Sequence, residues 1–119
     1  MSVFGIGNGV VNGERVTLSG TSATTVVDST GRSGIVITGI LLVNHSGDAR
    51  APIIDIYDGT AAFRVRDDAT LADQGAEDVK LAGGSLRMKK GDVLRVTANT
   101  GLTVHVSYID MAVSRQPGS

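Results

Sequence analysis

The fold is decided by the stretch Gly34-Ile-Val-Ile-Thr-Gly-Ile-Leu-Leu-Val-Asn44, a long apolar run rich in β-branched residues. The run ends in Asn44-His-Ser-Gly47, a combination of residues typical of a turn. A second run, Leu102-Thr-Val-His-Val-Ser-Tyr-Ile-Asp110, follows a turn at Asn99-Thr-Gly101. Such runs pack well in a sheet and poorly in a helix, so the sequence predicts an all-β protein.

The rest of the chain reads as short strands between turns. Turn residues recur about every eight to twelve positions, which predicts a single antiparallel β-sandwich or jelly roll of about eight strands. The acidic segment 67–78 leaves room for one short helical turn. The predicted organisation is an extended Gly-rich arm at 1–13, a β-sandwich domain at 14–113 and a C-terminal tail at 114–119. The predicted strands cover 14–19, 23–28, 35–44, 53–58, 62–66, 79–81, 85–89, 92–98 and 102–112.

Alternation along these strands predicts which side chains form the core. Gly39 interrupts the longest run and marks a bulge or a bend, because glycine inside a strand often does. The predicted core residues are Ile37, Leu41, Val43, Ile54, Ile56, Leu94, Val96, Val104 and Val106.

Composition narrows the classes of function. The 119 residues suffice for one domain, and 11 basic against 12 acidic residues give a net charge of −1. We therefore expect no nucleic-acid partner, and no apolar stretch is long enough to predict a membrane span. Cysteine is absent and aromatic residues make up only 3% of the chain, which disfavours thiol chemistry and ligand recognition by stacking.

The acidic segment is the best candidate for a metal site. Its hard oxygen ligands suit calcium, but their spacing does not match an EF-hand loop. The alternative is a solvated or partner-facing loop, because charge clusters are usually solvated. The carboxylates concerned are Asp67, Asp68, Asp73, Glu77 and Asp78.

Other candidate motifs predict no chemistry. His105 lies between two valines of an alternating strand and should point outward, while His45 lies in a turn. Gly5-Ile-Gly7-Asn-Gly9 has the glycines of a phosphate loop but lacks the preceding strand and the following helix. We expect no catalytic residue and no cofactor.

Two further groups are candidates for binding a partner. Arg87 and Lys89 lie two residues apart on one strand face, next to Lys90 and with Arg95 as a further candidate neighbour. They could contact an acidic neighbour such as the 67–78 segment of another copy. In the N-terminal arm, Val3, Phe4 and Ile6 are the apolar anchors that a neighbouring chain would bind and order.

Five segments in succession resemble small β-sandwich structural proteins of tailed bacteriophage virions. They are Ile40-Leu-Leu-Val-Asn-His-Ser-Gly47, Ile56-Tyr-Asp-Gly-Thr60, Leu81-Ala-Gly-Gly84, Met88-Lys-Lys-Gly-Asp-Val-Leu-Arg-Val96 and Gly101-Leu-Thr-Val-His-Val106. The resemblance covers roughly residues 35–110, and its motifs are turn signals rather than catalytic signatures.

The resemblance implies a non-enzymatic virion protein, assembled in the host cytoplasm and carried in the phage particle. The first expectation is a capsid decoration (cement) protein, with a head–tail connector or tail accessory protein as the alternative. Its partners would be the major capsid protein or other virion proteins. A homo-oligomer is expected, with a trimer favoured, since closed rings suit symmetric positions on a shell. A carbohydrate- or receptor-binding β-sandwich is the rival from another class, and the scarcity of aromatic residues weakens it.

Overall fold

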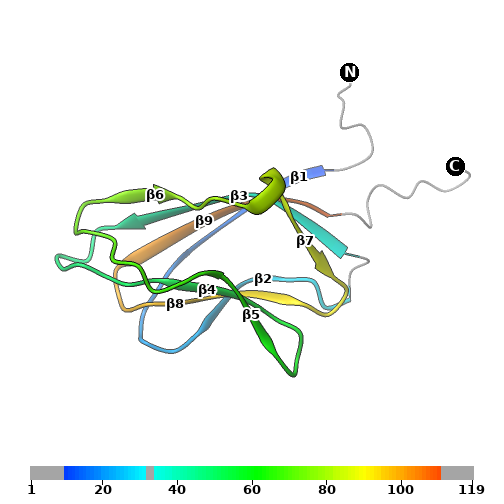
Figure 1. The fold of residues 1–119 in the computed structure, drawn as a ribbon, viewed down its shortest axis with the longest axis horizontal. Coiled ribbons are helices and arrows are strands. Elements are labelled where there is room, and N and C mark those ends of the chain that lie inside the picture. The colour runs from blue at the N-terminus through cyan, green and yellow to red at the C-terminus, as the bar shows by residue number, and fades with distance from the viewer. Residues whose placement is uncertain (1–9, 32–33, 111–119) are drawn as a thin grey trace, which may run out of the picture.

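The computed structural model describes residues 10–31 and 34–110, which form two antiparallel sheets packed face to face (Figure 1). One sheet has the order β1 (Val10–Thr17), β9 (Leu102–Asp110), β3 (Gly34–Asn44) and β6 (Ala76–Asp78), with β7 (Leu86–Lys89) also paired to β3. The other has the order β2 (Thr24–Asp28), β8 (Val93–Thr97), β4 (Ile53–Tyr57) and β5 (Ala62–Arg66). The prediction of an all-β antiparallel sandwich is confirmed.

Strand β3 is the spine of the larger sheet. β9 pairs with it from Ile35 to Asn44, while the opposite edge is shared by β7, which pairs with residues 34–37, and β6, which pairs with residues 41–43. This long apolar run is therefore covered along both edges, as its composition predicts for a central strand.

A β-bulge in β3 changes which residues enter the core. The register with β9 shifts between Ile37 and Gly39. Ile35 and Ile37 point inward before the shift, and Ile40 and Leu42 point inward after it. An extra residue in one strand moves every later side chain to the other face.

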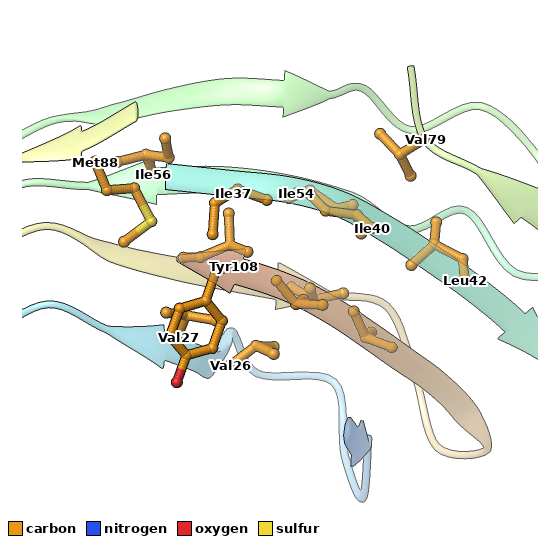
Figure 2. Packing of buried hydrophobic residues seen from close by; sticks show 14 of the residues in the cluster. Val26, Val27, Ile37, Ile40, Leu42, Ile54, Ile56, Val79, Met88 and Tyr108 are labelled. Carbon is orange, nitrogen blue, oxygen red and sulfur yellow. The ribbon is translucent and has the colours of Figure 1, made fainter. Parts of the chain in front are cut away.

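The bulge makes two core predictions wrong. Leu41 is 38% exposed and Val43 is only half-buried, because both lie beyond the shift and face outward. The other seven predicted core residues are buried, and Figure 2 shows three of them, Ile37, Ile54 and Ile56, among the inward-facing side chains. Each fully buried Val, Leu or Ile stabilises the fold by about 1.5–3 kcal/mol relative to an exposed one.

The segment between β5 and β7 also differs from the prediction. The short strand β6 lies at 76–78 rather than at 79–81, and the buried Val79 donates its backbone N–H to Ile40 O at 2.9 Å. Besides β6, the acidic segment 67–78 holds the isolated bridge of Leu71 to Arg50, and it has no helical turn. The one short 3₁₀ turn in the described ranges, η2 (Ala82–Gly84), follows β6 instead.

The connections gather at two opposite ends of the sandwich. The loop end carries the β1–β2, β3–β4, β5–β6 and β8–β9 connections. The hairpin end carries the β4–β5 hairpin, the β7–β8 turn and the β2–β3 connection. The first described strand starts there too, because Val10 pairs with Asp110, so residues 10–13 of the predicted arm belong to β1 (Figure 1).

Candidate partner-binding surface

The loop end is organised by Asn44, whose side chain is completely buried. Its amide nitrogen donates to the carbonyl oxygens of Asp48 at 2.8 Å, Leu71 at 3.0 Å and Ala72 at 3.2 Å. Its Oδ1 accepts from Ser46 N at 3.0 Å and from Ser46 Oγ at 2.7 Å. Asn44 therefore ties the β3–β4 loop to the β5–β6 loop, and the Asn-His-Ser-Gly motif has a structural role.

Close backbone packing completes this end. Gly101 has φ +88°, and a Cβ built on it would lie 2.7 Å from Ser46 Cβ and 2.8 Å from Ser46 Cα. Asp73 Oδ1 accepts the backbone N–H of Gly47 at 2.9 Å, so this carboxylate fixes the neighbouring turn. His45 Nδ1 lies 3.2 Å from Gln74 Oε1.

Glu77 forms an ion pair within the chain. Its two carboxylate oxygens each accept a hydrogen bond from Arg66, Nε and Nη2, at 2.8 Å. The Arg66 side chain is only 7% exposed, and the hydrogen bond to it lowers the pKa of Glu77. This bidentate pair joins β5 of one sheet to β6 of the other, so it helps to fix how the sheets sit together.

The other predicted acidic residues are exposed but dispersed. Asp67 pairs with Arg64 and Asp73 caps the turn at Gly47, whereas Asp68 makes no side-chain contact of this kind. Asp78 lies on β6 opposite Leu41, facing away from the core. Within residues 10–31 and 34–110, no group of three or more His, Asp or Glu side chains comes together that could hold a metal ion.

The hairpin end carries an open hollow of about 430 Å³, which we call the Phe63 hollow. It is lined by Ile56, Asp58, Phe63, Arg87, Lys89, Lys90 and Asp92. Ile56 is buried, while Phe63 on the edge strand β5 is 58% exposed. The structure thus brings the predicted Arg87 and Lys89 together with Lys90 beside an exposed aromatic ring.

The charges in the hollow differ in how they are partnered. Asp58 accepts backbone N–H groups from Ala61 at 2.7 Å and Thr60 at 2.8 Å, and these bonds lower its pKa. Asp92 accepts the N–H of Lys89 at 2.9 Å. The side chains of Arg87, Lys89 and Lys90 have no hydrogen bond or ion pair with any described residue. Both carboxylates are therefore committed to the backbone, and the three cations face solvent.

Two residues differ from the sequence analysis. Arg95 lies away from the other cations, and Phe63 was not identified as a candidate. Arg95 is on the outer face of the other sheet, where it bonds Asp55 Oδ1 at 2.9 Å and stacks 4.2 Å from the Tyr57 ring centroid. Phe63 was not singled out, although it follows the Asp58-Gly59 hairpin signal and is one of only two phenylalanines in the chain.

His105 faces outward between Arg15 and Leu41 of neighbouring strands, as predicted. Val3, Phe4 and Ile6 lie outside the described residues.

No protein-family model and no curated protein matches the sequence. Among solved structures, the chain is similar to one described as the cyanophage Pam1 capsid asymmetric unit, with a TM-score of 0.54 and 17% identity over 92% of this chain and 90% of that one. It also matches a pentameric capsid protein from metagenomic phage sequences, with a TM-score of 0.48 and 17% identity over 92% of this chain and 68% of that one. The Pam1 match confirms, as a likeness of fold, the resemblance to small β-sandwich phage proteins.

A third match is the extra small virus of the giant freshwater prawn Macrobrachium rosenbergii, in the form of its virus-like particle. There the TM-score is 0.46 and the identity is 12%, over 92% of this chain and 82% of that one. At identities this low, the matches show a shared arrangement of strands and nothing more. Among the described residues, no helix is long and apolar enough to cross a membrane.

Proposed function

We propose that this chain is a non-enzymatic structural protein of a bacteriophage virion, and more specifically a capsid decoration or cement protein that stabilises the head. The observation that carries the proposal is the Pam1 likeness, which extends over 92% of this chain and 90% of that chain. Agreement over nearly the full length of both chains means that the two share a whole architecture rather than a common hairpin.

The strand order supports a jelly roll in particular. Along its described residues, the chain changes sheet six times, between β1 and β2, β2 and β3, β3 and β4, β5 and β6, β7 and β8, and β8 and β9. Apart from the β4–β5 hairpin, neighbouring strands within each sheet are therefore not consecutive in sequence. Two packed sheets connected in this manner are typical of jelly rolls, which are common in viral capsids.

The described side chains offer little for catalysis. His45 is hydrogen-bonded to an amide, and His105 lies between Arg15 and Leu41 on neighbouring strands. In the part of the chain that the structure describes, neither histidine is paired with a nucleophile or a carboxylate, a pairing that acyl-transfer chemistry needs. The buried polar residues Ser29 and Asn44 are fully used in holding connections together.

We expect the protein to work as a homo-oligomer, with a trimer favoured, bound to the major capsid protein or to other virion proteins. Val3, Phe4 and Ile6 are proposed as anchors that bind a neighbouring chain. Apolar side chains buried at a partner contribute most of the energy of such a contact. The arm would leave the sandwich at the hairpin end, where β1 begins.

The proposal is tested on purified particles. Mass spectrometry and imaging should find the protein at many copies on the head, and deleting residues 2–9 should lower its occupancy or the heat resistance of the particle. This deletion leaves β1 intact, because the strand begins at Val10. Deleting residues 114–119 serves as the control for removal of a terminal segment.

Other results would change the assignment. Equal occupancy and equal particle stability after the 2–9 deletion would refute the role of the arm. Location at the neck or tail would favour the connector or tail accessory alternative, and a positive glycan screen would favour the carbohydrate- or receptor-binding rival. A protein found only in host cytosol would remove the virion role.

A further inference from the structure

We propose that the Phe63 hollow of one copy binds the acidic loop end of a second copy, through Arg87, Lys89 and Lys90 against Asp48, Asp68 and Asp73. This inference rests on the proposed function, because it specifies which surfaces meet in the proposed homo-oligomer. The observations behind it come from the two ends of the sandwich.

The hollow has the composition of an unfilled contact. Its floor, Ile56, is buried, and its wall, Phe63, leaves 58% of its surface in solvent. An exposed aromatic ring beside an arginine is typical of the centre of a protein–protein contact, where aromatic residues and arginine are enriched. Three cations without a side-chain hydrogen bond or ion pair to a described residue line this hollow and outnumber its two carboxylates, Asp58 and Asp92. The surplus of positive charge favours an anionic occupant.

The loop end supplies such an anionic group. Asp48 keeps 80% of its side chain exposed, and Asp68 and Asp73 are exposed too. The neighbouring cation, Arg50, pairs with one of them, because its Nη1 lies 4.0 Å from Asp48 Oδ2, a long ion pair. Its side chain is only 16% exposed, and it donates from Nε and Nη2 to Thr100 O at 3.4 and 3.3 Å. The loop end therefore presents three exposed carboxylates beside one largely buried arginine, which forms a long ion pair with Asp48.

A single chain cannot make this contact with itself. β3 runs from the hairpin end to the loop end over eleven residues, which at a rise of about 3.3 Å per residue separates the two ends by about 35 Å. The occupant must be another copy, and because two different surfaces meet, the contact is head-to-tail. Such contacts close into rings when the rotation allows it, so a ring of copies is the expected product.

The test uses two charge-reversed variants of the full chain. One carries Arg87→Glu and Lys89→Glu in the hollow, and the other carries Asp48→Lys and Asp68→Lys at the loop end. All four residues are accessible to solvent, and the ion pair that their side chains make with a described residue is the long 4.0 Å contact between Asp48 and Arg50, so circular dichroism melts should stay close to wild type. Sedimentation velocity is measured from low micromolar to several hundred micromolar protein, at low and high salt.

Wild type should associate with rising concentration and dissociate in high salt, because the contact is between exposed charges. Each variant alone brings like charges together and should stay monomeric even where wild type associates, with apparent affinity at least tenfold weaker. An equimolar mixture should associate again, because each variant then meets an opposite charge at both of its surfaces. A Phe63→Ser variant should also lose association, while its circular dichroism spectrum and melting temperature stay close to those of wild type.

The inference is overturned if wild type is monomeric throughout, if either variant associates like wild type, or if the mixture stays monomeric. Loss of particle occupancy in the hollow variant, combined with a monomeric mixture, would make the major capsid protein the occupant instead. Restored association without any virion location would leave this contact standing while the proposed function fails.

Discussion

The two ends of the sandwich use polar residues in opposite ways. At the loop end, Asn44 makes five hydrogen bonds within the chain and is completely buried. At the hairpin end, Arg87 and Lys89 reach solvent without an internal partner. Both ends are built from turns with similar residues, so composition alone does not tell them apart.

This difference separates residues that hold the fold from residues free to serve a partner. A buried polar group is kept because its removal costs stability, whereas an exposed cation beside an exposed aromatic ring contributes little to the isolated domain. Substitutions of the buried Asn44 at the loop end should therefore change the free energy of unfolding, whereas substitutions of exposed charges at either end should change association.

The largest effect is expected for Asn44→Ala. It removes all five hydrogen bonds and leaves a polar cavity, which should lower the free energy of unfolding by about 3 kcal/mol. Asn44→Asp should be at least as harmful, because a carboxylate would face three carbonyl oxygens. Urea unfolding measures both, with Lys89→Ala as the hairpin-end control, and equal stability of all three variants would abolish the distinction between the ends.

Two glycines allow a matched comparison. Gly101 at the loop end and Gly91 at the hairpin end have φ of +88° and +92°, but only Gly101 lies against another residue. Gly91→Ala should cost about 1 kcal/mol for its backbone conformation, and Gly101→Ala about 2–3 kcal/mol because Ser46 must also move. Thermal unfolding of the two variants measures both losses of stability. Equal losses would show that Ser46 can move away from the added Cβ at no cost in stability.

A third prediction concerns the pair that joins the sheets. Because Arg66 lowers the pKa of Glu77 from 4.5, the pair stabilises the fold fully above about pH 4.5, and that stability is lost as pH falls through the lowered pKa. Glu77→Gln should lower the free energy of unfolding by about 1–2 kcal/mol at pH 7, an amount reduced by the partial exposure of Glu77. The free energy of unfolding of this variant should also fall less steeply as the pH is lowered. Urea unfolding at several pH values measures it, with Asp68→Asn, which removes an exposed carboxylate, as the matched control.

Much of the fold could be predicted because apolar alternation is a local signal. Strands β3, β8 and β9 follow directly from their β-branched runs, and their turns follow from Asn, Asp and Gly. The faces of Leu41 and Val43 could not be predicted, because Gly39 marks a bulge without saying on which side the extra residue falls. The short β6 was misplaced because three residues carry no periodicity, and its pairing with β3 is a tertiary effect.

The candidate surface was only half predictable. The spacing of Arg87 and Lys89 placed both on one strand face, whereas Glu77 looked equivalent to the other carboxylates of its segment. Its partner, Arg66, is only eleven residues away in sequence but lies on the other sheet. Phe63 was missed because a strand residue at an unpaired edge has the same local pattern as one in the core.

The smallest effect on stability, and the most informative one for the hairpin end, is expected for Phe63→Ser. The ring is 58% exposed, and it pairs across the hairpin with Ile56 at the edge of its sheet. Its loss should change the free energy of unfolding by no more than about 0.5 kcal/mol, as for most surface substitutions.

The matched core variant is Ile54→Ser, on the partner strand and fully buried, which should cost several times more. If Phe63→Ser proves as costly as Ile54→Ser in urea unfolding, the ring belongs to the core and the hairpin end is not a free surface. If its stability is unchanged while self-association is lost, then the ring stabilises the assembled copies and not the single domain.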